Sequence, residues 1–321
     1  MRIEELQQLG ELWGPSGRED RVRTFLREAL GACSLESTVD PLGSLSVRVG
    51  SGERRLLVGA SMDQPFGFAN ALEKDGRLRI SLQGPAAPLG FLGSTVEFAS
   101  GLRGVVGSDK SPHGGVPEEG DLFVAVGTSS AAETEAVVTL GDPAVRRIPW
   151  LSDGQQVAGS DLWCRGGCAI LLELCRLWPQ NAPWTLEAVF AAHGVLSGRG
   201  LSVALRRHTP DACVVLEGLP ATPGGTPGTG ALLGLRGASG AGDPALGAQL
   251  EAAAARASLS VVGVLSSLTH PLAAGVAASA TGVPWAHLGF AVENWGAGAE
   301  LCRRGDLEAV AHLLKAFAEV L

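Results

Sequence analysis

The chain has 321 residues, and 45% of them are hydrophobic, which is enough for one large domain or two medium ones around a sizeable core. Its formal net charge of −8 argues against a nucleic-acid groove built on bulk positive charge, so we expect no nucleic-acid partner. No apolar run of membrane-spanning length is free of charges and helix breakers, and the charged N-terminus does not resemble a signal peptide, so we expect no membrane partner.

The first part of the chain is predicted to mix helices and strands. Residues 1–13 place apolar side chains on one face of an amphipathic helix. Ser16 and Glu19 have the spacing of a capping box for the helix that follows. The runs 45–49 and 55–60 are predicted strands, and the short polar loop between them predicts a hairpin.

From about residue 68 the pattern changes to short strand-like runs between Gly, Pro and charged turns. These runs lie at 78–82, 95–98, 122–127 and 136–140. They predict an all-β insert over residues 68–155, in the form of a small barrel. The rest of the chain, residues 1–67 and 156–321, is predicted to form one α/β domain that this insert interrupts.

After residue 156, strands and helices alternate, which is typical of a mostly parallel sheet with helices on both faces. Strands are predicted at 186–191, 212–216, 260–265 and 286–290, and helices at 165–178, 200–207, 245–257, 271–280 and 306–320. The stretch 156–176 reads as a polar loop that enters a buried helix, and Gly166 and Gly167 would let that helix start against a strand. In such sheets the loops outside the strand ends carry the site chemistry.

Polar side chains at the predicted strand ends are the first candidates for a site. Asp63 follows one strand, His193 and Glu217 each end another, and Asp161 precedes the buried helix. His193 suits acid–base work or metal binding, and Glu217 suits a cation with oxygen ligands. Simpler roles compete at each position. Asp63 and Asp161 would also serve as turn or helix caps, and Glu217 would also pair with an arginine.

Cysteine chemistry is not indicated. Cys164 lies near a predicted helix start, where a thiolate would be stabilised, but no partnered base is identifiable, so we interpret it as a small apolar residue. The six cysteines follow no disulfide or zinc pattern, and we expect reduced thiols and a cytoplasmic location.

Ordered segments along nearly the whole chain carry a resemblance to a known family. They are GPSGRED at 14–20, VDPLGSL at 39–45, SMDQPFGF at 61–68, DLFVAVGTSS at 121–130 and VAGSDLWCRGGCAILLEL at 157–174. Together they resemble the tetrahedral-assembly metallo-aminopeptidases, which comprise glutamyl aminopeptidases and proteins labelled cellulase M. The resemblance implies a cytoplasmic exopeptidase fold that forms homo-oligomers, with two zinc or cobalt ions, a bridging water and a Glu as general base.

Carried over residue by residue, the resemblance places the family's site on side chains that mostly do not bind metal. In chain order, the first metal-binding His, the bridging Asp, a Glu, an Asp and the last His correspond to Ser61, Trp163, Val195, Glu217 and Gly296. Gly194 stands at the position of the general base, and Asp63 keeps the carboxylate that orients the first His. Of the five ligand positions, only Glu217 keeps a metal-binding side chain, which does not suffice for a pair of ions.

We therefore expect a protein that has lost di-metal peptidase activity and binds no metal cofactor. It would be retained to bind a peptide or small molecule in the old cleft, or as an assembly subunit in a homo-oligomer. The alternative is an active metal-dependent aminopeptidase or hydrolase that uses zinc or cobalt at a rearranged site of Asp63, Asp161, His193 and Glu217. In the alternative these side chains must converge, whereas a relic cleft should have Trp163 packed at the metal position.

Overall fold

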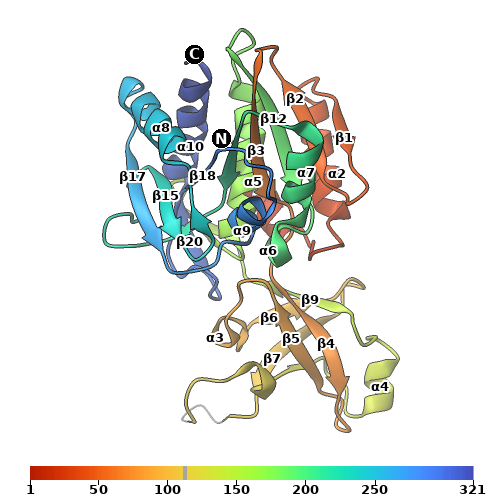
Figure 1. Cartoon of the computed structure of the whole chain (residues 1–321). Helices are drawn as coiled ribbons and strands as arrows, with labels where there is room; N and C mark the ends of the chain where they lie inside the picture. Colours follow the sequence, from red (N-terminus) through yellow and green to blue (C-terminus); the bar gives the residue numbers. More distant parts are fainter. Residues whose placement is uncertain (111–113, 321) are drawn as a thin grey trace.

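The structure is a computed structural model that describes residues 1–110 and 114–320. It consists of an α/β domain and a closed β-barrel, which lie one above the other in Figure 1. The barrel strands are β4 (Phe66–Leu72), β5 (Leu78–Gln83), β8 (Leu122–Ala125), β7 (Arg103–Ser108), β6 (Thr95–Glu97) and β9 (Pro143–Arg147), in order of pairing. The predicted insert spans 68–155, and the barrel strands of the structure span residues 66–147.

The α/β domain is built on a nine-stranded sheet. In spatial order its strands are β1 (Ser37–Val39), β2 (Leu45–Val49), β12 (Trp184–Ala191), β3 (Arg54–Ser61), β13 (Ala212–Leu216), β18 (Trp285–Gly289), β15 (Ala231–Gly237) and β16 (Gly240–Ala241), with β17 (Val261–Ser266) paired to β15. The central strands β12, β3, β13 and β18 are parallel to one another. The expected α/β fold with an inserted β-barrel is confirmed.

Helices cover both faces of this sheet. They are α1 (Ile3–Glu11), α2 (Asp20–Gly31), α5 (Leu162–Leu177), α8 (Pro244–Arg256) and α10 (Arg304–Ala318) on one face, and α7 (Arg199–His208) and α9 (Pro271–Ala278) on the other. Shorter elements are α3 (Pro88–Phe91), η1 (Glu119–Asp121), α4 (Ala131–Glu135), α6 (Gly194–Ser197), β10 (Leu151–Ser152), β11 (Gln156–Gly159), β14 (Leu219–Pro220), β19 (Ala291–Val292) and β20 (Glu300–Arg303). Within the described residues, no helix is long and apolar enough to cross a membrane.

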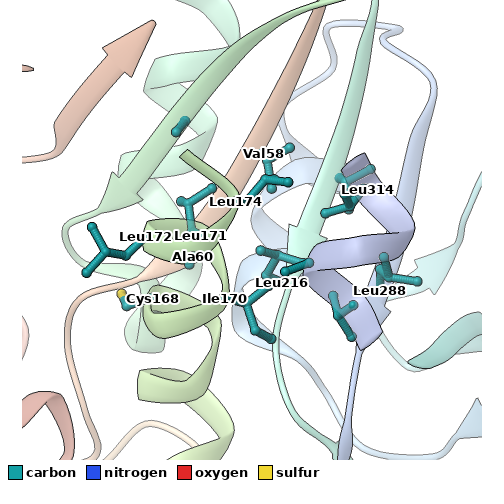
Figure 2. Packing of buried hydrophobic residues seen from close by; sticks show 14 of the residues in the cluster. Val58, Ala60, Cys168, Ile170, Leu171, Leu172, Leu174, Leu216, Leu288 and Leu314 are labelled. Carbon is teal, nitrogen blue, oxygen red and sulfur yellow. The ribbon is translucent and has the colours of Figure 1, made fainter. Parts of the chain in front are cut away.

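The helix α5 lies at the centre of the larger core. Figure 2 shows its apolar side chains, together with Leu314 of α10, packed toward Val58, Leu216 and Leu288 of three central strands. A Cβ atom on Gly167 would lie 2.5 Å from the carbonyl oxygen of Leu216, so the close approach of α5 to β13 requires glycine there. Each leucine buried in this way stabilises the fold by roughly 1.5–3 kcal/mol.

The expected hairpin between residues 45–49 and 55–60 is wrong. Strand β12 lies between β2 and β3, antiparallel to β2 and parallel to β3. All residues of β12 are buried, and its backbone groups need partners on both sides. A Cβ on Gly52 would lie 2.2 Å from the Pro183 oxygen, so the connecting loop packs against the chain that enters β12. The loop that connects β2 to β3, although turn-like in sequence, therefore spans the strand β12 that lies between them.

Two smaller expectations are also wrong. Glu19 is the N-cap of α2 without a side-chain capping bond. Its carboxylate instead accepts from the backbone N–H groups of Gly17 and His193, and Ser16 donates to Asp63. The segment 136–140 contains no strand, because the chain leaves α4 through turns before β9 begins. The capping-box residues are used for long-range contacts, which local spacing does not reveal.

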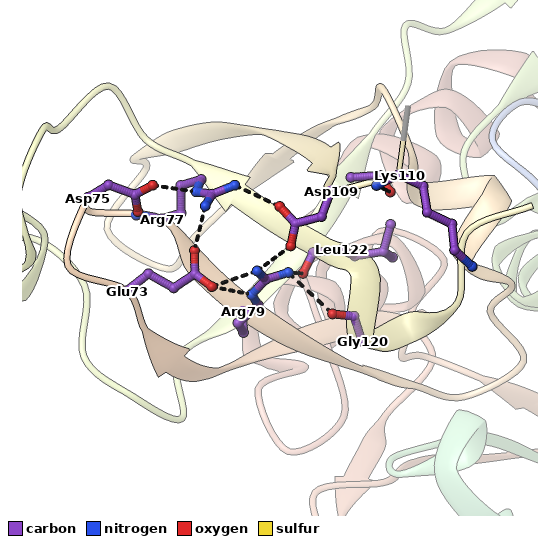
Figure 3. A network of polar contacts seen from close by, with 9 residues as sticks. Glu73, Asp75, Arg77, Arg79, Asp109, Lys110, Gly120 and Leu122 are labelled. Atoms are coloured by element: carbon purple, nitrogen blue, oxygen red, sulfur yellow. Dashed lines mark hydrogen bonds and ion pairs between the residues drawn. The ribbon is translucent and has the colours of Figure 1, made fainter. Parts of the chain in front are cut away.

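One rim of the barrel carries a charged network. Arg77 and Arg79, around the start of β5, each bond to Asp109 and Glu73 (Figure 3). Glu73 directly follows β4 and Asp109 directly follows β7, so these contacts link the ends of three barrel strands. The arginine hydrogen bonds hold the pKa of the Asp109 carboxyl below its ordinary value. Because these groups are a fifth to two fifths exposed, salt screens them and their contribution to stability is small.

Candidate functional site

Three parallel strands deliver the candidate residues to one edge of the sheet. Ser61 is the last residue of β3, His193 follows β12 and Glu217 follows β13. The carboxyl ends of parallel strands in one sheet lie side by side, which is where α/β folds form their sites. The barrel is attached at the same edge, because β4 follows β3 after four residues.

Asp63 fixes the backbone beside this edge. Its fully buried carboxylate accepts from the N–H groups of Gly194 (2.9 Å) and Val195 (3.0 Å) and from the hydroxyl of Ser16. Burial, and then the charge of Glu19, raise the pKa of Asp63 to about 6. The structure thus commits both oxygens of Asp63 to holding the loop after β12.

The structure leaves no room for a side chain at Gly194. A Cβ atom there would lie 2.2 Å from the Ser61 hydroxyl oxygen and 3.0 Å from an Asp63 oxygen. The Ser61 hydroxyl is itself buried and has no hydrogen-bond partner in the part of the chain that the structure describes. Gly194, at the position that the resemblance assigns to the general base, therefore has no side chain. Ser61, at the position of the first metal-binding His, has a side chain too short to take the place of that ligand.

Trp163, at the position assigned to the bridging Asp, is completely buried in the first turn of α5. Its ring lies 5.1 Å from that of Trp295, and its Nε1 has no hydrogen-bond partner within residues 1–110 and 114–320. Glu300 holds this region together, because its carboxylate accepts from the N–H groups of Trp163 (3.0 Å) and Gly296 (2.7 Å). Burial, followed by the charge of Asp161, raises the pKa of Glu300 to about 8. Sequence reasoning assigned no role to Glu300.

Asp161 is engaged in a buried ion pair. Its Oδ1 lies 2.7 Å from Nη2 of Arg146, a residue of barrel strand β9, and both side chains are 1% exposed. Its other oxygen accepts from Gln64 at 3.1 Å. Arg146 also donates to the backbone oxygen of Gly90 and lies over the Phe91 ring. Asp161 makes no capping bond to α5, so its role is to connect the barrel to the α/β domain.

The four residues of the alternative site do not form one cluster. His193 is half-buried and lies against Gly17, in the loop between α1 and α2. Cys164 is fully buried and donates to the Asp161 backbone oxygen. Burial raises the pKa of its thiol well above the ordinary value, as expected for an unreactive cysteine. Among the described residues, three or more metal-binding side chains converge in one place only, and of the four candidates this place includes only Glu217.

That place is a buried cluster of Glu217, His270 and His287, whose ligand atoms all lie within 4.8 Å of one another. Nε2 of His287 is 3.7 Å from Oε2 of Glu217, and the two imidazole rings are 4.8 Å apart at their centroids. Burial lowers the pKa of His270 to about 4 and that of His287 well below its ordinary value, so both rings are neutral. Burial also raises the pKa of Glu217 to about 8.

Sequence reasoning missed both histidines of this cluster. His287 lies inside β18 and His270 lies in the loop before α9, more than fifty residues beyond Glu217. A signal was present, since His287 is a polar residue within a run of apolar strand residues. The pairing of β13 with β18 brings His287 beside Val215 and hence close to Glu217.

A cavity of about 880 Å³ opens beside these residues. Its walls are the loop 83–87 after β5, helix α6, the loop before α9, one face of α9 and the segment Trp295–Gly296. Among the described residues that line it, none carries a formal charge, and most are apolar. The cavity therefore suits an uncharged ligand with apolar groups.

The side chains at the edge do not fit a pair of metal ions. The five corresponding positions offer one carboxylate, at Glu217, and the neighbouring carboxylates of Asp63 and Asp161 are already bonded to N–H groups and to Arg146. Two ions held a few ångströms apart need several anionic or imidazole ligands, including one that bridges them.

Comparison with known proteins identifies relatives of this chain. The sequence profile of the M42 glutamyl aminopeptidases matches residues 43–313. FrvX of Escherichia coli (strain K12), for which an aminopeptidase activity is proposed, is 30% identical over 71% of this chain and 67% of its own. A protein of Acetivibrio thermocellus with the same proposed activity is 26% identical, and the match spans 62% of its length.

Solved structures share the whole fold. An aminopeptidase from the archaeon Desulfurococcus kamchatkensis superimposes with a TM-score of 0.91 at 24% identity, over 99% of this chain and 94% of its own. The TET1 peptidase of Pyrococcus horikoshii, described as able to assemble into a tetrahedron or a large octahedral shell, gives a TM-score of 0.89 at 21% identity, over 99% of each chain. Both similarities include the barrel as well as the α/β domain.

Proposed function

We propose a non-catalytic, ligand-binding function for this chain, which belongs to the M42 glutamyl aminopeptidase family. In this proposal the di-metal peptidase centre has been lost, and the cleft between the barrel and the sheet edge binds a peptide or another small molecule through apolar contacts. The observation that carries the proposal is the packing around Gly194, where the contact with Ser61 leaves no space for a catalytic base.

In this proposal, the groups around the position of the base also do not support proton transfer. In a di-metal hydrolase, a carboxylate must take a proton from the metal-bound water and then give it to the leaving amine. At the corresponding place in this chain, the N–H groups of Gly194 and Val195 donate to the two oxygens of Asp63. Asp63 is therefore not free to act as the base. Trp163, rather than a carboxylate, occupies the first turn of α5.

The first test is turnover. We expect no hydrolysis of leucine or glutamate p-nitroanilide above the blank when the purified chain is assayed with zinc, cobalt or manganese. FrvX, assayed under the same conditions, is the reference relative. Metal-dependent turnover that rises in proportion to the concentration of this chain would refute the loss of peptidase activity.

The second test is the charge preference of the cleft. An aminopeptidase must bind a free α-amine, whereas an uncharged cavity penalises a desolvated ammonium group. We expect N-acetyl-leucine amide to bind more tightly than leucine amide by about tenfold or more, as measured by isothermal titration calorimetry. Tighter binding of the free amine would contradict this proposal.

Neighbouring residues on α9 supply a matched pair of variants. Ala278 lines the cavity, whereas Ala277 is exposed on the same helix and does not line it. Ala278→Trp should block binding of the acetylated amide, and Ala277→Trp should leave it unchanged. Equal effects of the two substitutions would place the ligand elsewhere.

Homo-oligomer formation and a cytoplasmic location belong to the same proposal. Support for assembly comes from relatives of this fold, one of which is described as a dodecamer and another as a tetrahedral or octahedral shell. Support for a reducing compartment comes from the six cysteines, all of which are free. Light scattering coupled to size-exclusion chromatography should give a mass several times that of the 32.9 kDa chain. A monomer at micromolar concentration would refute the assembly.

A further inference from the structure

We infer that Glu217, His270 and His287 form a binding site for a single divalent transition-metal ion of the zinc class. The site does not reproduce the family's centre, because neither histidine stands at one of the five ligand positions that the resemblance assigns. It also departs from the expectation that the chain binds no metal. The inference does not depend on the proposed ligand-binding function, because it rests on a different set of side chains.

The three side chains offer free ligand atoms in one buried place. Oε2 of Glu217, Nδ1 of His270 and Nε2 of His287 are all buried, and none has a hydrogen-bond partner among the described residues. The three residues are 0%, 2% and 6% exposed, respectively. Buried polar atoms normally have partners, so an unpartnered ligand-type atom on each of three side chains whose ligand atoms come within 4.8 Å of one another points to a shared cation.

The spacing is close to that of a zinc site. Bonds of about 2.0–2.1 Å in tetrahedral geometry place two ligand atoms about 3.3 Å apart. The Glu217 and His287 atoms are 3.7 Å apart, so a change of a few tenths of an ångström brings them to that spacing. All three side chains place a ligand atom within 4.8 Å of the other two.

The opposite ends of two ligands are already fixed. Glu217 Oε1 accepts from the N–H of Leu272 in the first turn of α9, at 3.2 Å, which leaves Oε2 free. His270 Nε2 lies 3.0 Å from the Ser266 hydroxyl. In the tautomer that donates from Nε2 to Ser266, the lone pair of Nδ1 remains available to bind a metal ion. Such outer contacts orient metal-binding imidazoles and carboxylates.

The backbone that carries His270 is equally constrained. The Ser239 hydroxyl donates to the His270 carbonyl and accepts from its N–H, at 3.0 and 2.6 Å. Helix α9 then begins with Pro271, whose fixed φ suits a first helical position. The loop therefore presents His270 in one orientation, as a preorganised ligand requires.

The donor set indicates which ions fit. Two imidazoles and one carboxylate bind zinc with a fourth position left for water or another ligand, and they also suit iron(II) or cobalt(II). Calcium and magnesium prefer oxygen ligands and are not expected. Thr269 and Pro271, which flank His270, line the large cavity, and the ring of Trp295 lies 5.3 Å from that of His270. The site thus lies directly behind one wall of the cleft.

The test is the metal content of the purified full chain. After incubation with zinc and desalting, mass spectrometry should find about one zinc per chain, and cobalt(II) should give the visible absorption spectrum of a four-coordinate ion. Glu217→Gln, His270→Gln and His287→Gln should each lower the zinc content at least tenfold. Zinc should raise the melting temperature of the wild type but not of these variants.

Another His–Glu pair provides the matched control. His208 lies 3.2 Å from Glu187 elsewhere on the sheet, without a third ligand in the described residues. His208→Gln should therefore leave the zinc content unchanged. Circular dichroism identifies any variant that has lost its fold, and the cobalt spectrum of the wild type tests the site without any substitution.

The outcomes separate this inference from the proposed function. No zinc and no cobalt spectrum in the wild type would refute the site, and so would one zinc that persists in all three folded variants. Two metals per chain together with peptidase turnover would refute the loss of the di-metal centre. One zinc without turnover is the combination expected when both proposals hold.

Discussion

Asp161→Asn is expected to destabilise the chain by about 3–5 kcal/mol, because it leaves the buried guanidinium of Arg146 without its counter-charge. Both side chains are 1% exposed, so water cannot replace the lost carboxylate. Asn keeps the shape of Asp and tolerates the left-handed backbone that Asp161 adopts at φ 55°, which restricts the change to charge and hydrogen bonding. The measurement is equilibrium unfolding in urea, with circular dichroism and fluorescence as independent probes.

Two further variants isolate the cause. Asp243 caps α8 by accepting from the N–H of Leu246, and Asn is an equally good cap, so Asp243→Asn should change stability by less than about 0.5 kcal/mol. Adding Arg146→Met to Asp161→Asn removes the unpaired charge and should recover part of the loss. If Asp161→Asn unfolds at the same urea concentration as the wild type, the ion pair does not join the two domains as described.

The architecture was predictable because its signals are local. Periodic apolar residues predicted α7, α8 and α10 to within two residues at each end, and the paired glycines 166 and 167 predicted the close packing of α5 against a strand. The insert was recognisable because its short strands and turns differ in texture from the alternating pattern around it.

Pairing between distant strands was not predictable in the same way. The loop after β2 has the residues of a tight turn, yet β12, some 130 residues later, enters between β2 and β3. Only the burial of every residue of β12 explains that insertion, and burial depends on the rest of the fold.

The contacts of the candidate site residues were also not predictable from the sequence. Sequence position placed Asp63 and Asp161 at strand or helix ends, but their partners, the Gly194 N–H and Arg146, come from segments far away or from the barrel. His270 and His287 drew no prediction, since each is an isolated histidine in sequence. Their meeting with Glu217 depends on the order of β13, β18 and α9 in space.

Trp163→Asp is expected to give no peptidase activity and to destabilise the chain by about 3–5 kcal/mol. The substitution restores the residue type that the resemblance assigns to the bridging position, but the position of the base remains filled by Gly194 against Ser61. Trp163 is 0% exposed and packs against Trp295, so its removal creates a cavity. The new carboxylate would be buried near Glu300, whose pKa burial already raises to about 8.

Trp163→Phe is the matched control for this change. The indole Nε1 bonds to none of the described residues, so phenylalanine loses no bond seen in the structure and keeps most of the packing. It should cost less than half of the free energy of unfolding lost in Trp163→Asp. Urea unfolding measures both variants, and leucine p-nitroanilide with zinc or cobalt measures activity. Turnover by Trp163→Asp alone would show that the remaining groups suffice for catalysis, because a single carboxylate can rescue only a site whose base and other ligands are already in place.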